Sequence, residues 1–192
     1  MNFLAHIYLS GDSKAIQFGN FLGDWIKGRA YEQYPEEIQK GILLHRAIDA
    51  YTDNHEITRK WAQHLKSHYH KYAGVVVDIF YDHFLSLRWQ DFSAVPLHMY
   101  IQETYKALQA RRDMLPPNAK HALYRMVLNK RLESYVKLDG IYDALSTMSI
   151  YTSMPPYADF AMVVIHRHYE EYIQDFKAFM RDIIAYINKH YG

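Results

Sequence analysis

The stretch Tyr72–Trp89, YAGVVVDIFYDHFLSLRW, decides how the rest of the chain is interpreted. It is apolar almost throughout, which predicts a buried helix, yet it carries Asp78, Asp82 and His83. Residues four apart lie on one face of a helix, so the two carboxylates are expected to face the same side. Two carboxylates on an apolar helix repel each other and are costly to bury. The pattern therefore predicts a positive partner beside them, either an arginine or a metal ion.

Helical periodicity continues on both sides of this stretch. Apolar residues recur at helical spacing in every long segment, no segment alternates as a strand would, and no internal repeat is present. The sequence predicts an all-α fold of about seven or eight helices in a single domain over residues 1–192. Residues 118–138 are expected to form a helix, and Ala158–Tyr191 one long helix or two abutting ones.

The composition limits the chemistry of any site. The chain has no Cys, which excludes disulfides, thiolate metal sites and cysteine nucleophiles. A metal would be held by His, carboxylates, carbonyls or water, which favours Mn, Mg, Fe or Zn. The formal net charge of +1 gives no argument for nucleic acid as a partner. With no signal-peptide pattern and no apolar run near the roughly 20 residues of a membrane span, we expect a cytoplasmic protein without stable membrane association.

Several ionisable residues in the first half of the chain are flanked by apolar side chains. They are His6, Asp24, His45, Asp49, Asp78, Asp82 and His83. Asn20 and Asp24, like His45 and Asp49, are four residues apart and so share a helix face. Helical bundles build sites for hard metal ions from His and carboxylate groups on facing helices. We predict that His6 and the four aspartates hold a divalent metal ion, with His45 as a further candidate.

Ordinary structural roles offer another interpretation of the same residues. The candidate ion pairs are Asp24 with Lys27, Asp49 with Arg46 or Arg59, and Asp82 with Arg88. His6 taken alone is typical of a core histidine bonded to a carbonyl group. However, the chain has too few apolar-flanked Lys and Arg residues nearby to neutralise all four aspartates, which favours the metal site.

Four blocks of sequence carry a family resemblance. They are MNFLAH (1–6), GNFLGDWIKG (19–28), GILLHRAIDAYTDNH (41–55) and YAGVVVDIFYDHFL (72–85). At these residues the chain resembles the acyl carrier protein phosphodiesterases, a family related to the HD-type metal phosphohydrolases; the second half matches mainly in length and helical character. The resemblance implies an HD-like helical bundle that depends on a divalent metal, Mn²⁺ by preference, with Mg²⁺ or Fe²⁺ as alternatives. A contiguous His-Asp pair is absent, the nearest arrangements being His45 with Asp49 and the reversed Asp82–His83.

The resemblance also implies a reaction. It is hydrolysis of the phosphodiester that joins 4′-phosphopantetheine to a serine of holo-acyl carrier protein, which gives apo-carrier protein and 4′-phosphopantetheine. For this reaction we expect a carboxylate outside the metal shell to take the proton of the attacking water. We expect His45 or His83 to protonate the leaving serine oxygen, and Arg46 to hold the phosphate as a charged fork.

The expected protein substrate is acidic, so a basic docking surface is predicted. One candidate cluster is Arg29, Lys40, Arg59, Lys60, Lys66 and Lys71, and the other is Arg111, Arg112, Lys130 and Arg131.

Two alternative functions stay open at this point. The first is a metal phosphohydrolase that acts on a nucleotide or another small phosphate ester, and the second is a non-catalytic helical binding protein.

Overall fold

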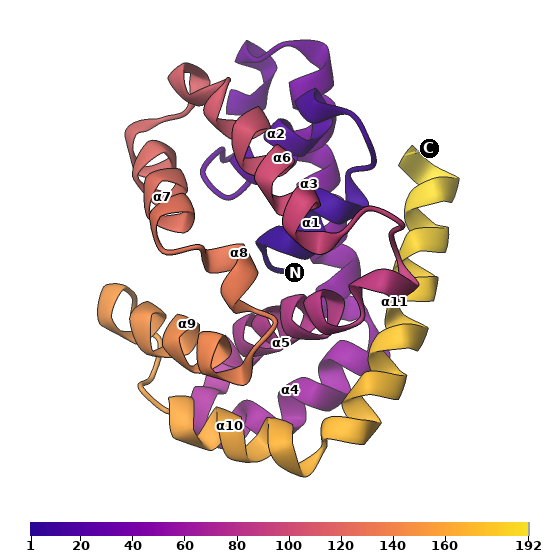
Figure 1. Ribbon diagram of the computed structural model, residues 1–192, viewed down its shortest axis with the longest axis vertical. Coiled ribbons are helices and arrows are strands. Elements are labelled where there is room, and N and C mark those ends of the chain that lie inside the picture. The colour runs from indigo at the N-terminus through magenta and orange to yellow at the C-terminus, as the bar shows by residue number, and fades with distance from the viewer. Residues whose placement is uncertain (192) are drawn as a thin grey trace. The chain divides into compact units, whose positions relative to one another are not determined.

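The computed structural model describes residues 1–191, which form helices and connecting turns and contain no β-strand (Figure 1). The α-helices are α1 (Phe3–Leu9), α2 (Lys14–Leu22), α3 (Glu36–Asn54), α4 (Glu56–Tyr69), α5 (Ala73–Leu87), α6 (Leu97–Gln109), α7 (Pro117–Leu128), α8 (Arg131–Ser134), α9 (Leu138–Tyr151), α10 (Ala158–Arg167) and α11 (Tyr169–Tyr191). The 3₁₀-helices are η1 (Ala30–Gln33), η2 (His70–Tyr72), η3 (Trp89–Asp91) and η4 (Arg112–Met114). The all-α prediction is confirmed. Within residues 1–191, no helix combines the length and the apolar character that crossing a membrane requires.

The predicted number of helices is too low, because residues 1–191 form eleven α-helices. With seven residues, α1 is too short for its periodicity to stand out in the sequence. The single helix expected over residues 118–138 is wrong. Its break lies at Lys130, whose φ of 47° is left-handed and cannot continue a right-handed helix. The C-terminal stretch forms the second of its two predicted arrangements, two abutting helices.

The chain divides into two compact units. Unit 1 consists of residues 1–2, residues 50–87 and the chain from Ser134 onward, and unit 2 consists of residues 3–49 and 88–133. Both α3 and α8 contribute residues to each unit. The single domain expected over residues 1–192 stays a prediction.

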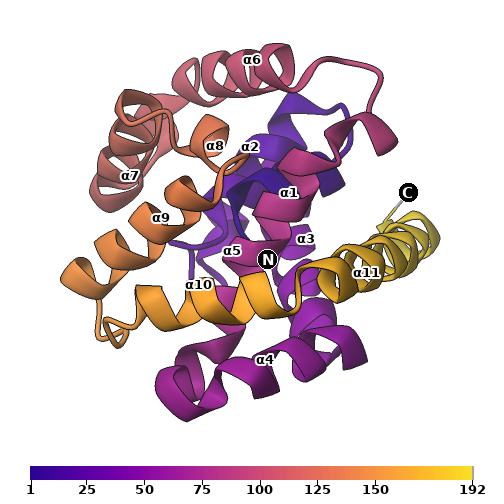
Figure 2. The same ribbon diagram turned by 60° about the horizontal axis from the view of Figure 1, so that its bottom comes forward.

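Unit 1 is built around α5, the stretch that the sequence singles out. Helix α5 packs against α4, α9 and α11, and α10 packs against α4 and α9 (Figures 1 and 2). Aromatic rings fill the core: Trp61 stacks on Tyr172 with 4.0 Å between ring centroids, and Tyr81 stacks on Phe179 with 4.4 Å. Full burial of a large apolar side chain contributes about 1.5–3 kcal/mol. This packing accounts for the nearly continuous apolar character of α5.

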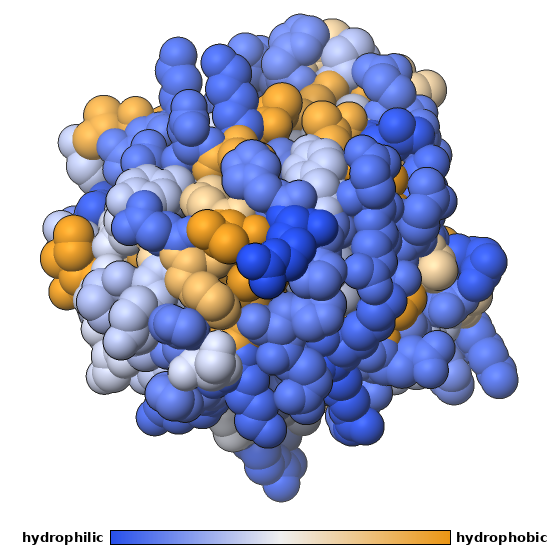
Figure 3. All heavy atoms as spheres, turned by 90° about the horizontal axis from the view of Figure 1, so that it is seen from below, coloured by the Kyte–Doolittle hydropathy of each residue, from blue (hydrophilic) through white to orange (hydrophobic). Residues whose placement is uncertain are grey.

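Helices α9 and α10 of unit 1 also expose apolar side chains. Ile150 is 75% exposed and Val163 is 54% exposed. The space-filling view shows orange hydrophobic residues that interrupt an otherwise mostly hydrophilic face (Figure 3). The core of unit 1 receives the other faces of these helices through residues such as Leu145 and Ile165.

Unit 2 contains α1, α2, α6, α7 and most of α3. Helix α2 packs against α1 and α6, and α6 also packs against α7. The N-terminus of α2 is capped by Ser13, whose hydroxyl accepts a hydrogen bond from the backbone N–H of Ile16 at 3.3 Å. Glu36 and Glu37 occupy the first turn of α3, where negative charge favours the helix dipole.

Helices α2 and α3 cross so closely that their backbones touch. A Cβ atom added to Gly19 would lie 2.1 Å from the carbonyl oxygen of Ile38, and one added to Gly41 would lie 2.2 Å from the carbonyl oxygen of Ile16. Because main-chain atoms cannot move aside as a flexible side chain can, only glycine fits at these two positions. The crossing holds Asn20, the residue after Gly19, against the turn of α3 that follows Gly41.

Candidate metal centre

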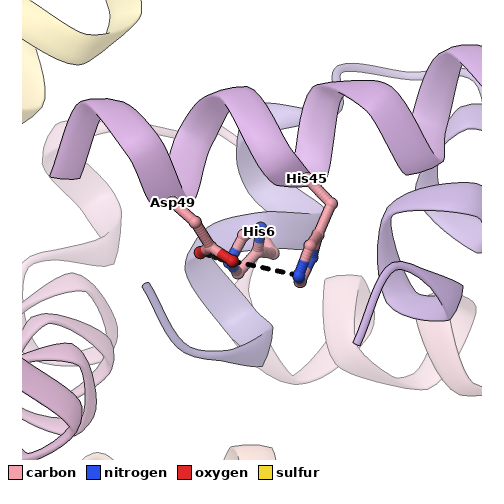
Figure 4. A group of neighbouring side chains, drawn as sticks. All are labelled: His6, His45 and Asp49. Atoms are coloured by element: carbon pink, nitrogen blue, oxygen red, sulfur yellow. Dashed lines mark hydrogen bonds and ion pairs between the residues drawn. The ribbon is translucent and has the colours of Figure 1, made fainter. Parts of the chain in front are cut away.

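Side chains from α1 and α3 converge within unit 2 (Figure 4). His6 comes from α1, while His45 and Asp49 come from successive turns of α3, and the possible ligand atoms of all three lie within 4.8 Å of one another. His6 Nε2 lies 3.0 Å from Asp49 Oδ1, and His45 Nε2 lies 3.1 Å from Asp49 Oδ2. Each oxygen of one carboxylate therefore faces one imidazole. We call these three residues the His-His-Asp group.

The two histidines are buried and the carboxylate is not. The side chains of His6 and His45 are 4% and 7% exposed, whereas that of Asp49 is 42% exposed. The two imidazole rings stack with 4.2 Å between their centroids. The group is therefore rigidly held on its histidine side and open to solvent on its carboxylate side.

Asn20 of α2 fixes the orientation of His45. The amide nitrogen of Asn20 donates to the carbonyl oxygen of His6 at 3.1 Å and to Ser10 Oγ at 2.7 Å. Ser10 Oγ is an acceptor here because its own proton goes to the same His6 carbonyl oxygen at 2.8 Å. The amide oxygen of Asn20 points the other way and accepts from His45 Nδ1–H at 3.2 Å. With this proton on Nδ1, a neutral His45 turns the lone pair of Nε2 toward Asp49.

A lone pair that faces a carboxylate is stabilised by a cation placed between the two. His45 Nε2 and Asp49 Oδ2, 3.1 Å apart, are both acceptors in the neutral imidazole and the ionised carboxylate. They repel each other unless a proton or a metal ion lies between them. Atoms at right angles around one ion, each about 2.1 Å from it, lie about 3 Å apart, which matches the spacing seen here. The imidazole and carboxylate donors therefore fit a hard or borderline divalent ion.

The pKa values of His6 and Asp49 keep these two residues in metal-binding form. Burial lowers the pKa of His6 to about 4, although the hydrogen bond with Asp49 opposes the shift. For Asp49, partial burial alone would raise the pKa, but the imidazoles of His45 and His6 that face its two oxygens outweigh it and hold the pKa below its ordinary range. Neutral imidazole and ionised carboxylate are the states that bind metal ions.

Asp24 lies at the edge of the group. Its Oδ1 atom is 3.6 Å from His45 Nε2, and its side chain is 47% exposed. The preceding residue, Gly23, packs directly on the ring of His45, because a Cβ atom there would lie 2.4 Å from Cγ of the ring. The structure thus brings Asp24 close to the His-His-Asp group, and its predicted role as a metal ligand stays a prediction.

Arg46 braces the segment that follows α2. Its Nη2 atom donates to the carbonyl oxygens of Ile26 and Gly28 at 3.0 and 2.8 Å. Its guanidinium also lies over the ring of Tyr31, 5.3 Å from the centroid. These contacts give Arg46 a structural role in unit 2, and the phosphate-holding role stays a prediction.

The other predicted ligands, Asp78 and Asp82, lie on α5 in unit 1. Asp82 is fully buried, and Asp78 Oδ1 lies 3.2 Å from the nitrogen of Met1. The His-His-Asp group is contained in unit 2, so neither residue belongs to it. The ligand role of Asp78 and Asp82 stays a prediction.

His83, on the same helix, has both ring nitrogens engaged within unit 1. Nδ1 donates to the carbonyl oxygen of Tyr135 at 2.8 Å, so a neutral ring accepts at Nε2 from the hydroxyl of Tyr169 at 3.0 Å. Burial lowers the pKa of His83, which favours this neutral form. These contacts support a structural role, and the acid role expected from the sequence stays a prediction.

The sequence points to Asn20 only through its spacing, and it does not single out its partner Ser10 or the glycines at 19, 23 and 41. A signal for them is present, because glycines inside an otherwise helical pattern mark positions where another backbone or ring approaches closely. Asn20 stands directly after one such glycine and Asp24 directly after another. Asn20 and Gly23 contact His45 directly and so fix the position of its ring.

Comparison with known proteins gives consistent matches. A family model described as acyl carrier protein phosphodiesterase matches residues 1–183. Proteins named acyl carrier protein phosphodiesterase from Salmonella agona (strain SL483) and Salmonella newport (strain SL254) are each 30% identical to the chain over 150 residues, which is 78% of this chain and 78% of theirs. No solved structure gives a significant match. All four blocks of the resemblance lie inside the range that the family model matches.

Proposed function

Because the chain belongs to the acyl carrier protein phosphodiesterase family, we propose that it hydrolyses the phosphodiester between 4′-phosphopantetheine and a serine of holo-acyl carrier protein. The products are apo-carrier protein and 4′-phosphopantetheine. The family name denotes a hydrolase, which favours an enzyme over a non-catalytic helical binding protein. A donor set of imidazoles and carboxylates supports a relationship to the HD-type metal phosphohydrolases.

The observation that carries the metal dependence is the convergence of two imidazoles on one carboxylate. His6, His45 and Asp49 would hold the ion, and Asn20 keeps the Nε2 lone pair of His45 directed at it. We propose Mn²⁺ as the ion, with Mg²⁺ or Fe²⁺ as alternatives. When bound, such an ion supplies Lewis-acid chemistry, since it lowers the pKa of water and offsets charge on phosphoryl oxygens.

The remaining residues of the site would handle protons. In the hydrolysis, a water oxygen forms a bond to phosphorus, the bond from phosphorus to the serine oxygen breaks, and that oxygen takes a proton. We assign proton transfer to Asp24, because it approaches only one imidazole and is 47% exposed. Asp24 would accept a proton from the attacking water and pass it to the serine oxygen. Neither nitrogen of His45 is left for this task once Nδ1–H bonds Asn20 and Nε2 faces the ion.

A mobility assay on holo-carrier protein tests the proposal. The purified chain, with Mn²⁺ added, is expected to convert the holo form to the apo form, and a chelator is expected to stop conversion until Mn²⁺ is restored. No conversion by a protein that holds stoichiometric metal would contradict the carrier-protein substrate and favour a nucleotide or small phosphate ester. No conversion and no bound metal would contradict the metal site as well.

A further inference from the structure

The basic residues of the chain are concentrated in one part of unit 2. Residues 106–131 contain seven of the 22 Lys and Arg residues but only one of the 21 acidic residues, Asp113. This range covers the end of α6, η4, α7 and the start of α8. The segment is therefore strongly positive in a chain whose formal net charge is only +1.

Three of the cations in this segment stand outside the ion pairs of the described chain. Across residues 1–191, no ion pair joins Arg112, Lys120 or Lys130 to an acidic side chain. In the other basic cluster that the sequence suggests, three of the six residues form ion pairs with acidic side chains. Its ion pairs are Arg29 with Glu32 at 2.7 Å, Lys40 with Glu36 at 3.0 Å, and Lys60 with Glu171 at 2.7 Å. Charge that is not already paired is available for a partner.

Apolar side chains stand among these cations. On α7, Tyr124 and Leu128 are each 63% exposed. A small cavity of about 70 Å³ lies where the end of α6 meets α7, and Arg112, Lys120 and Tyr124 are among its lining residues. We call Arg112, Lys120, Tyr124, Leu128 and Lys130 the α6–α7 surface. Cations around exposed apolar groups fit an acidic protein face with an apolar centre, whereas a nucleic-acid backbone offers the charge alone.

We propose that the α6–α7 surface docks the carrier protein through acidic side chains that surround an apolar contact. This inference rests on the proposed function for the identity of the partner. Helix α6 packs against α2, the helix that carries Asn20 and leads into Asp24. The docking surface and the His-His-Asp group therefore belong to the same unit, so the carrier protein would bind to the unit that cleaves its phosphodiester.

Charge reversal tests the proposal directly. For the double variant Arg112→Glu/Lys120→Glu, we expect the KM for holo-carrier protein to rise at least about tenfold while kcat stays within about twofold. The matched control is Lys66→Glu/Lys71→Glu, which makes the same charge change at exposed residues of the other cluster and is expected to change KM by less than about twofold. Circular dichroism and turnover of a small chromogenic phosphodiester check that the variants are folded with an intact site.

Salt dependence and direct binding separate the remaining outcomes. The KM of the unaltered chain should rise with salt, and that of the Arg112→Glu/Lys120→Glu variant should respond less. An unchanged KM in this variant, or an equal rise in the control, would overturn the docking surface and leave the proposed function intact.

Binding of apo-carrier protein, measured by fluorescence anisotropy, is independent of turnover. If the unaltered chain binds it through these residues but cleaves no holo-carrier protein, docking stands and the proposed function fails; if it binds duplex DNA instead, docking is overturned.

Discussion

Two pairs of histidines stack with nearly the same geometry, one in each unit. In unit 2, the ring centroids of His6 and His45 are 4.2 Å apart with 20° between the planes. In unit 1, those of His64 and His168 are 4.1 Å apart with 16° between the planes. Ring stacking alone would therefore rank the two pairs as equals.

The surroundings of the pairs differ. In unit 1, His64 Nδ1 bonds the hydroxyl of Tyr172 at 2.8 Å, and His168 Nδ1 bonds Glu171 at 3.0 Å. Glu171 already pairs with Lys60, and of the two imidazoles only that of His168 bonds it, so this carboxylate is not shared as Asp49 is. In unit 2, both rings turn one nitrogen to the same carboxylate. The comparison teaches that convergence on a shared anion, rather than the number or stacking of histidines, makes a candidate metal site.

Replacement of the shared carboxylate should give the largest effect. Asp49→Asn keeps the shape of the side chain but removes the charge that both imidazoles face. We expect bound Mn²⁺ to be lost and kcat/KM on holo-carrier protein to fall by well over about 100-fold, more than loss of an outer partner causes. Metal analysis and the mobility assay measure both. Glu171→Gln is the matched control in unit 1 and should leave kcat/KM within about twofold; an equal loss there would remove the distinction between the pairs.

A smaller effect is expected from the residue that orients His45. Asn20→Ala removes the acceptor of His45 Nδ1–H, so the Mn²⁺ affinity should fall about 10–100-fold, while saturating Mn²⁺ restores most of kcat. A titration of activity with Mn²⁺ measures this. The control is Gln17→Ala on the same helix, where a buried amide donates to the carbonyl oxygen of Gly11. Equal Mn²⁺ affinities in the two variants would show that Asn20 acts on stability alone.

The pH dependence of stability should show the smallest difference between the two histidine pairs. In chelator-treated protein, the pKa of His6 is about 4 when folded and 6.5 when unfolded, so the unfolded chain takes up the proton first as the pH falls. The contribution of His6 to the free energy of unfolding is therefore complete above pH 6.5. It is lost as the pH falls toward 4, at about 1.4 kcal/mol per pH unit. The lowered pKa of Asp49 changes the free energy of unfolding only below the range from pH 4 to pH 6.5, starting near the ordinary carboxyl pKa of 3.8.

Urea unfolding between pH 4 and pH 7 measures this slope. His6→Gln should remove most of the His6 contribution. His64→Gln should remove less, because burial lowers the pKa of His64 too, but its ring lies partly at the surface. Identical slopes in the two variants would mean that burial does not distinguish the pairs.

Local sequence patterns predicted part of the site. The spacing of His45 and Asp49 places both on one face of α3, and the apolar flanks of His6 indicate a buried imidazole. Their meeting depends on the crossing of α2 and α3, which is set by glycines and is not encoded in any single periodicity. The same four-residue spacing of Asp78 and Asp82 on α5 occurs in unit 1, outside the His-His-Asp group. Spacing gives the face of a helix but not what that face meets.

The role expected of His83 shows the same limit. Its two partners lie 52 and 86 residues away along the chain, so no local pattern indicates that both ring nitrogens are engaged. The helical character of nearly every long segment was predictable because periodicity is local. The break at Lys130 was not, because a left-handed residue other than glycine leaves little trace in composition.

The contact between Gly19 and Gly41 has a consequence in genetics. Every other amino acid carries a Cβ atom, so any missense change at either codon would drive a carbon atom into a main-chain carbonyl group. In a screen for inactive alleles, such changes would be recovered alongside those at Asp49, although neither glycine has a side chain that a substrate could touch. As a mutational target, the candidate metal centre therefore extends into a helix crossing that is made of main-chain atoms.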